Sequence, residues 1–191
     1  MSLALKLAGQ GRDGVKANPM VGCVVVKDDQ IIAKGYHQTF GEAHAEINAL
    51  EQINHQADDS TLYVTLEPCS HVGKTPPCAQ AIIDASVQRV VIATLDPNPL
   101  VSGQGLALLE AAGIQVSVGL LENEALRLNR GFIKRMQTGL PFVTCKIAMS
   151  LDGKTAMASG ESQWITGEAA RTDVQHLRAK HQAIMTGSGT I

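Results

Sequence analysis

Four side chains with the chemistry of a metal centre stand close together in the sequence: His44, Glu46, Cys69 and Cys78. A catalytic zinc ion takes three protein ligands and keeps a fourth position open for water. One imidazole and two thiolates meet that requirement, so we predict that His44, Cys69 and Cys78 bind zinc. Glu46 then remains as a general acid and base that moves a proton between water and a leaving nitrogen.

The sequence around these side chains predicts the elements that position them. "AHAEINALEQIN" has the apolar spacing of an amphipathic helix, so His44 and Glu46 stand at a helix start. Cys69 follows the predicted strand "TLYVTL" and a proline, whereas Cys78 opens a predicted helix after two prolines. The N–H groups at helix starts favour a thiolate over a thiol. The pattern His-x-Glu, Pro-Cys and a later Cys is typical of zinc-dependent deaminases.

Two other interpretations of these residues stay open at this point. The cysteines could belong to a structural zinc site, for which His71 is the obvious fourth ligand. The chain could also be a deaminase that acts on nucleic acids or free bases. However, its net charge is −2 and it has no run of Lys and Arg, which argues against a nucleic-acid partner.

The first part of the chain predicts an α/β domain. A helix, "LALKLAG", precedes an antiparallel hairpin formed by "VGCVVV" and "IIAKGY", and strands and helices alternate from Thr61 onward. Alternation of this kind favours parallel pairing with right-handed crossovers. We therefore predict a three-layer α/β/α domain over residues 1–140, with a sheet of about five strands. A polar helix from Glu122 to Lys134 is its last predicted element.

Residues 141–191 predict the opening part of a second domain. They contain two expected strands, "PFVTCKIAMS" and "AIMTG", and a helix from Glu168 to Lys180. So few elements cannot enclose a core, since domains become marginal below roughly 60 residues.

Composition restricts the compartment and the partners. No apolar run reaches the roughly 18 residues of a membrane span, so we expect a cytoplasmic protein without a membrane contact. Thiols stay reduced in the cytoplasm, and clustered cysteines there are ligands or nucleophiles more often than disulfides. The remaining cysteines, Cys23 and Cys145, lie in apolar strand patterns, and we predict both as core residues.

Longer motifs add a family resemblance. "EPCSHVGKTPPC", "NPMVGCVVV", "GYHQTFGEAHAE" and "DPNPLVSGQG" resemble the deaminase domain of the bifunctional riboflavin-biosynthesis deaminase/reductase family, within the cytidine deaminase-like superfamily. The stretch from "KIAMSLDGKTA" to "SGESQWITG" is similar to the start of that family's reductase domain. Nucleoside and nucleic-acid deaminases usually have two residues between the cysteines, whereas eight separate Cys69 from Cys78.

The resemblance implies a function in two steps. The zinc-dependent deaminase domain would convert 2,5-diamino-6-ribosylamino-4(3H)-pyrimidinone 5′-phosphate to 5-amino-6-(5-phosphoribosylamino)uracil and ammonia. The dihydrofolate reductase-like α/β domain would then use NADPH to reduce the ribose, which we expect only of the full-length protein. The expected partners are this small-molecule substrate and further copies of the chain in a homo-oligomer.

The resemblance also implies further site residues. Positions that line the pyrimidine and the ribose phosphate in the family match Asn18, His37, Lys74, Asp96 and Asn98. Lys74, between Gly73 and Thr75, offers a cation and N–H donors to a phosphate. In the reductase part, the positions implied as NADP contacts are Ala148, Trp164 and Thr190, and those implied as substrate contacts are Ser162 and Arg178.

Overall fold

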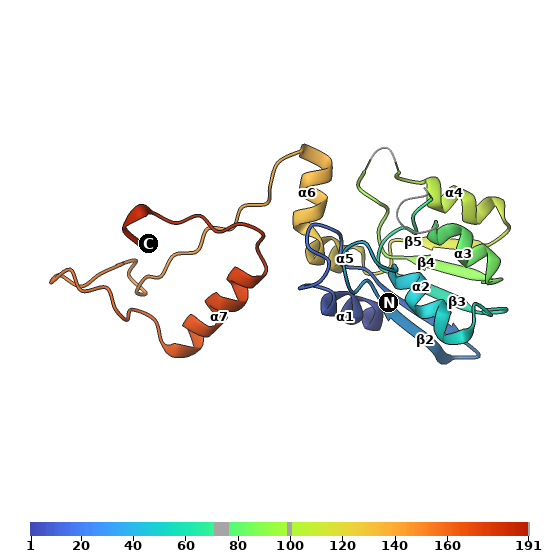
Figure 1. Ribbon diagram of the computed structural model, residues 1–191, viewed down its shortest axis with the longest axis horizontal. Helices are drawn as coiled ribbons and strands as arrows, with labels where there is room; N and C mark the ends of the chain where they lie inside the picture. Colours follow the sequence, from blue (N-terminus) through green and yellow to red (C-terminus); the bar gives the residue numbers. More distant parts are fainter. Residues whose placement is uncertain (71–76, 99–100, 191) are drawn as a thin grey trace. The chain divides into compact units, whose positions relative to one another are not determined.

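The computed structural model describes residues 1–70, 77–98 and 101–190, and the chain forms two compact units, Met1–Phe142 and Val143–Ile191 (Figure 1). The boundary predicted from the sequence lies at residue 140. His71 and Lys74 lie outside the described residues, and so do the glycine and threonine on either side of Lys74.

The first unit is built on a five-stranded mixed sheet. Its strands are β1 (Gly22–Lys27), β2 (Gln30–Tyr36), β3 (Thr61–Val64), β4 (Arg89–Ile92) and β5 (Gln115–Val118), in the spatial order β2-β1-β3-β4-β5. β1 is antiparallel to both of its neighbours, whereas β3, β4 and β5 are parallel to one another. The predicted hairpin and the predicted parallel strands are therefore both confirmed.

Helices cover both faces of this sheet and complete the three predicted layers (Figure 1). One face carries α2 (Ala45–Leu50, extended by the 3₁₀ turn Glu51–Ile53), α3 (Cys78–Asp84) and α4 (Gln104–Ala111). On the other face α1 (Ser2–Gln10) packs over β1 and β2, and α5 (Glu122–Leu128) packs against α1. None of the helices in the described residues combines the length and the apolar character that crossing a bilayer requires.

Strand β1 shows how the two faces are filled. Successive side chains of a strand point to opposite faces of its sheet. Cys23 and Val25 accordingly belong to the large core cluster beneath α2 and α3, whereas Val24 packs with Ala4 and Leu7 of α1. The prediction that Cys23 is a core residue is confirmed, since its side chain is fully buried.

The prediction of one continuous polar helix from Glu122 to Lys134 is wrong. The structure breaks it into α5 and α6 (Arg130–Thr138) at Asn129, whose φ of −106° leaves the helical range. The Asn129 side chain is buried and forms two hydrogen bonds with the backbone of Met20: Oδ1 accepts from N–H at 2.8 Å, and Nδ2 donates to C=O at 2.9 Å. These bonds connect segments that are 109 residues apart in the sequence.

In the second unit, the predicted helix is present as α7 (Glu168–Ala179), followed by the 3₁₀ turn Ser188–Thr190. The prediction of two strands in this unit is wrong, because residues 141–150 and 183–187 form no strand. A strand is stable only when other strands pair with it over an apolar face, and this short unit supplies no such sheet among its described residues. For the same reason the core prediction for Cys145 is wrong, and its side chain is exposed.

We predict that Asn129→Asp destabilises the first unit. The change replaces the Nδ2 donor with a second oxygen that faces the Met20 carbonyl, which leaves a buried acceptor without a donor. The expected loss is about 1–3 kcal/mol in the free energy of unfolding, measured by urea denaturation. Gln56→Glu makes the same chemical change at an exposed position and serves as the control. Equal urea midpoints for the two variants would contradict the proposed role of Asn129.

Candidate metal centre

Strand direction brings the candidate residues to one edge of the sheet. Gly22 at the start of β1 pairs with Tyr36 at the end of β2, and Cys23 pairs with Val64 at the end of β3. Val64 in turn pairs with Ile92 at the end of β4. The segment before β1 and the segments after β2, β3 and β4 therefore all leave the sheet at the same edge. These segments carry Asn18, His37, Cys69, Asp96 and Asn98.

The three predicted ligands meet at this edge. His44 is the N-cap residue of α2, Cys78 is the first residue of α3, and Cys69 lies in the segment that follows β3. The His44 Nδ1 atom is 3.1 Å from the Cys78 Sγ atom and 3.6 Å from the Cys69 Sγ atom. Among the described residues, these three form a group whose ligand atoms all lie within 4.8 Å of one another.

The separations of these atoms fit a zinc ion. With zinc bonds of about 2.0–2.1 Å to nitrogen and about 2.3 Å to sulfur, tetrahedral ligands are separated by about 3.6 Å. The observed distance from His44 Nδ1 to Cys69 Sγ, 3.6 Å, matches that value, and the distance to Cys78 Sγ, 3.1 Å, is about half an ångström shorter. One imidazole and two sulfurs also form a donor set that zinc prefers. The residues that are present therefore fit a three-ligand zinc centre.

The ligand side chains already interact electrostatically with one another. A hydrogen bond from the Cys78 thiol, reinforced by one with His44, lowers the pKa of the Cys69 thiol to about 4. The backbone N–H of Cys78 also donates to the Cys69 Sγ atom at 3.3 Å. The hydrogen bond to Cys69 raises the pKa of His44. The pair of cysteines thus readily supplies a thiolate, which is the form that binds metal.

Glu46 lies in the first turn of α2 and is 3% exposed. Its pKa is raised to about 7, mainly because burial disfavours the charged carboxylate, while the nearby His44 opposes this shift. A carboxyl group with a pKa near neutrality can both accept and release a proton at physiological pH. The environment of Glu46 therefore suits the general acid and base that the sequence predicts.

His37, which directly follows β2, lies against the ligand His44. The two rings are in edge-to-face contact, with centroids 5.3 Å apart. The Nδ1 atom of His37 lies 3.1 Å from the Ala43 carbonyl oxygen, to which it can donate, and Nε2 is buried without a partner among the described residues. Burial is the main cause that lowers the pKa of His37. A neutral ring would leave Nε2 as an acceptor beside the metal ligands.

The other implied substrate contacts are only partly assembled in the described residues. Asn18 is half-buried before β1, and its N–H donates to the Val15 carbonyl at 2.9 Å. Asp96 and Asn98 are half-buried after β4, where the Asn98 N–H donates to the Asp96 Oδ1 atom at 2.8 Å. Lys74, the implied phosphate contact, lies outside the described residues.

The sequence analysis did not single out two buried polar side chains that support this edge. Asn129 holds Met20, two residues after Asn18. Glu67, two residues before Cys69, is 4% exposed. The position of Glu67 directly before the Pro-Cys pair was a possible signal for its role. Asn129 gave no such signal, because its partner is far away in the sequence.

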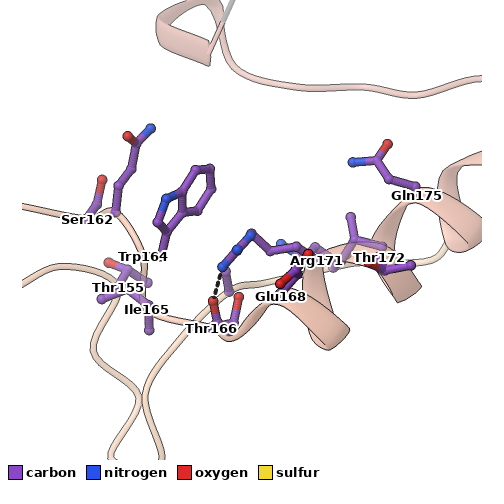
Figure 2. A pocket seen from close by; sticks show the side chains of 13 residues that line it. Thr155, Ser162, Trp164, Ile165, Thr166, Glu168, Arg171, Thr172 and Gln175 are labelled. Carbon is purple, nitrogen blue, oxygen red and sulfur yellow. Dashed lines mark hydrogen bonds between the residues drawn. The ribbon is translucent and has the colours of Figure 1, made fainter.

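In the second unit, some of the implied reductase contacts line one open hollow of about 670 Å³ (Figure 2). Ala148, Ser162 and Trp164 belong to its lining. Arg171 of α7 stacks on the Trp164 ring, with its guanidinium carbon 4.5 Å from the ring centroid, and donates to the Thr166 carbonyl at 2.7 Å. Arg178 is exposed further along α7 and does not line the hollow, and Thr190 stands in the terminal 3₁₀ turn.

The three-layer fold with a His/Cys/Cys ligand set and an adjacent glutamate defines the class of zinc-binding deaminase domains. Residues 1–94 match the family described as "Cytidine and deoxycytidylate deaminase zinc-binding region", and residues 141–191 match the "RibD C-terminal domain". Over its whole length the chain is similar to riboflavin biosynthesis proteins of the RibD type.

Individual relatives agree with this assignment. The riboflavin biosynthesis protein RibD of Escherichia coli is 58% identical over the whole chain, and the match covers 52% of that relative. The structure of Acinetobacter baumannii RibD has a TM-score of 0.88 and 57% identity, with coverage of 94% of this chain and 50% of that one. A tRNA:A34 deaminase is more distant, with 29% identity and a TM-score of 0.51. The chain thus spans about half the length of the curated relatives it matches.

We predict that Cys78→Ser reduces the zinc content from one ion per chain to near zero after dialysis. The serine hydroxyl stays protonated at neutral pH and is a poor replacement for a thiolate ligand. Zinc is measured by atomic emission on the purified protein. Cys145→Ser, which alters an exposed cysteine, is the matched control and should keep the full zinc content. A Cys78→Ser variant with undiminished zinc would exclude this ligand set.

Proposed function

We propose that the first unit catalyses the hydrolytic deamination of 2,5-diamino-6-ribosylamino-4(3H)-pyrimidinone 5′-phosphate. The products are 5-amino-6-(5-phosphoribosylamino)uracil and ammonia, in riboflavin biosynthesis. The observation that carries the proposal is the group formed by His44, Cys69 and Cys78, with the buried Glu46 in the same helix turn as His44. The similarity to RibD proteins supports the choice of substrate. A solved relative from Thermotoga maritima, 46% identical, is described as a diaminohydroxyphosphoribosylaminopyrimidine deaminase/5-amino-6-(5-phosphoribosylamino)uracil reductase and supports the same choice.

The reaction exchanges one bond at the ring carbon that carries the 2-amino group. A carbon–oxygen bond forms with water, and the carbon–nitrogen bond breaks to release ammonia. A zinc ion held by His44, Cys69 and Cys78 would supply Lewis acidity that makes water a better nucleophile at neutral pH. Glu46 accepts a proton from the attacking water and delivers it to the departing nitrogen. Its pKa of about 7 suits both halves of this transfer.

The surrounding residues would bind and orient the nucleotide. The buried Nε2 atom of His37 offers a hydrogen-bond acceptor next to the metal ligands, and amino groups of the pyrimidine are suitable donors. Asn18, Asp96 and Asn98 stand at the same edge of the sheet, where they would contact the ring and the ribose. Lys74 would pair with the phosphate.

For the second unit, we propose part of an NADPH-dependent reductase that acts on the ribose of the deaminated product. Ala148, Trp164 and Thr190 would contact NADP, and Ser162 and Arg178 would contact the substrate. We expect hydride transfer only from the full-length protein, since the chain spans about half the length of its relatives. A homo-oligomer and a cytoplasmic location stay predictions, to be tested by sedimentation and by fractionation of cells.

We predict that Glu46→Gln lowers kcat for ammonia release by roughly 10²–10⁴-fold while one zinc ion per chain is kept. Glutamine has nearly the same shape but cannot take up the proton of the attacking water. Ammonia is measured with a coupled assay on the pyrimidinone phosphate, with tRNA, cytidine and guanine as alternative substrates. Glu51→Gln, an exposed change in the same segment, is the control. Unchanged turnover of Glu46→Gln would exclude the mechanism, and turnover of an alternative substrate alone would exclude the proposed substrate.

We predict that Lys74→Ala raises KM for the phosphorylated substrate by roughly tenfold or more, because a charge-assisted contact with phosphate is lost. The KM for the dephosphorylated nucleoside should stay the same, and zinc should remain bound. Lys34→Ala removes an exposed lysine of β2 and is the control for the change in net charge. An equal increase in KM for both substrates would assign Lys74 a role other than phosphate binding.

A further inference from the structure

Glu67 is a buried side chain that no step of the proposed reaction uses. Among the described residues, its carboxylate accepts four backbone hydrogen bonds, from N–H groups of Asp96 and of the start of α4. Oε2 accepts from the N–H groups of Asp96 at 3.1 Å and Gly103 at 3.0 Å. Oε1 accepts from those of Gly105 at 2.9 Å and Leu106 at 3.2 Å. A carboxylate has about four lone-pair sites, so this side chain has no acceptor capacity left for a substrate.

Three of these four donors belong to the N-cap residue and the first turn of α4. The first N–H groups of a helix have no partner within the helix and are usually capped by a nearby side chain. The N-cap residue of α4 is Gly103, which has no side chain, and its φ of 81° requires a glycine-like conformation. Glu67 caps this helix from another segment, and its negative charge favours the positive end of the helix.

Gly105 brings the same helix directly against the metal-ligand segment. A Cβ atom at Gly105 would lie 2.0 Å from the carbonyl oxygen of Pro68, the residue between Glu67 and Cys69. Only a residue without a Cβ atom permits this approach. The first turn of α4 therefore packs on the backbone that leads to a predicted zinc ligand.

The fourth donor extends this connection to the implied substrate contacts. The N–H of Asp96 is held by Glu67, and the Asp96 carboxylate in turn accepts the N–H of Asn98 at 2.8 Å. This buried carboxylate, two residues from Cys69, therefore links the pair to the segment of the predicted ligand.

We propose that Glu67 is a positioning residue that sets the distance between the zinc centre and the segment with Asp96 and Asn98. The inference rests on the proposed function, because it treats those two residues as substrate contacts. In this role Glu67 would contact backbone N–H groups and not the metal or the nucleotide. It acts through the backbone of the segment it caps.

The test is Glu67→Gln, which keeps the size of the side chain but replaces one acceptor oxygen with an NH₂ group that faces N–H donors. We expect KM for the pyrimidinone phosphate to rise roughly tenfold, the size that follows from leaving a buried donor unsatisfied. The zinc content should stay at one per chain, and kcat should change much less than KM. Hydrogen exchange at the amides of Asp96, Gly103 and Gly105 should accelerate by a similar factor.

Ser60→Ala is the matched control, since Ser60 is buried before the other end of β3 and donates to the Ala57 carbonyl at 2.6 Å. That change should lower stability and leave KM and the three exchange rates as in the wild type. A purely structural role for Glu67 would make the two variants alike in KM, which overturns the proposal. Gly105→Ala provides a second route, because it displaces α4 without altering the carboxylate, and it should also raise KM with zinc bound.

The outcomes separate a failure of the positioning role of Glu67 from a failure of the proposed deaminase function. If Glu67→Gln does not fold, Gly105→Ala decides, and a wild-type KM for that variant overturns the positioning role. If the wild-type protein releases no ammonia from the pyrimidinone phosphate, the proposed function fails. In that case the hydrogen-exchange rates, which need no substrate, decide whether Glu67 holds the backbone of Asp96, Gly103 and Gly105. Wild-type exchange rates in Glu67→Gln overturn that role whatever the activity.

Discussion

The direction of β1 is the constraint on which the candidate site depends. This strand lies between β2 and β3 and is antiparallel to both, while β4 continues parallel to β3. The segment before β1 therefore shares one edge with the segments after three other strands. A shift of one residue in this pairing would turn Cys23 and Val25 away from the core. Burial of the β1 side chains thus fixes the register, and the register brings together the residues of the edge.

Buried polar groups at this edge fall into two kinds. Glu67 and Asn129 have their hydrogen bonds satisfied by backbone groups, and each holds a segment that carries implied substrate contacts. Glu46 and His37 are buried beside the predicted metal ligands, where desolvation raises the pKa of the first and lowers that of the second. Satisfied groups give rigidity, whereas desolvated groups near a metal ligand keep the capacity to exchange a proton or accept a donor.

The two units differ in how well their side chains are covered. The first unit encloses a contiguous core beneath α2, α3 and α4. In the second unit, large apolar side chains such as Leu151 and Met185 are almost fully exposed. About fifty residues cannot bury enough apolar surface to offset the entropy of ordering them.

The sequence by itself determined the metal-ligand candidates, the alternation of strands and helices, and the first hairpin. These features are local: Asp28 and Asp29, for example, form the hairpin turn with the positive φ values of 50° and 58° that a type I′ turn requires. Only the tertiary structure decided the break at Asn129, the exposure of Cys145 and the capping of α4 by Glu67. Each of these depends on partners distant in the chain or on the absence of a neighbouring strand. Periodicity and spacing encode which face of an element is apolar, but they do not say which backbone groups will meet that face.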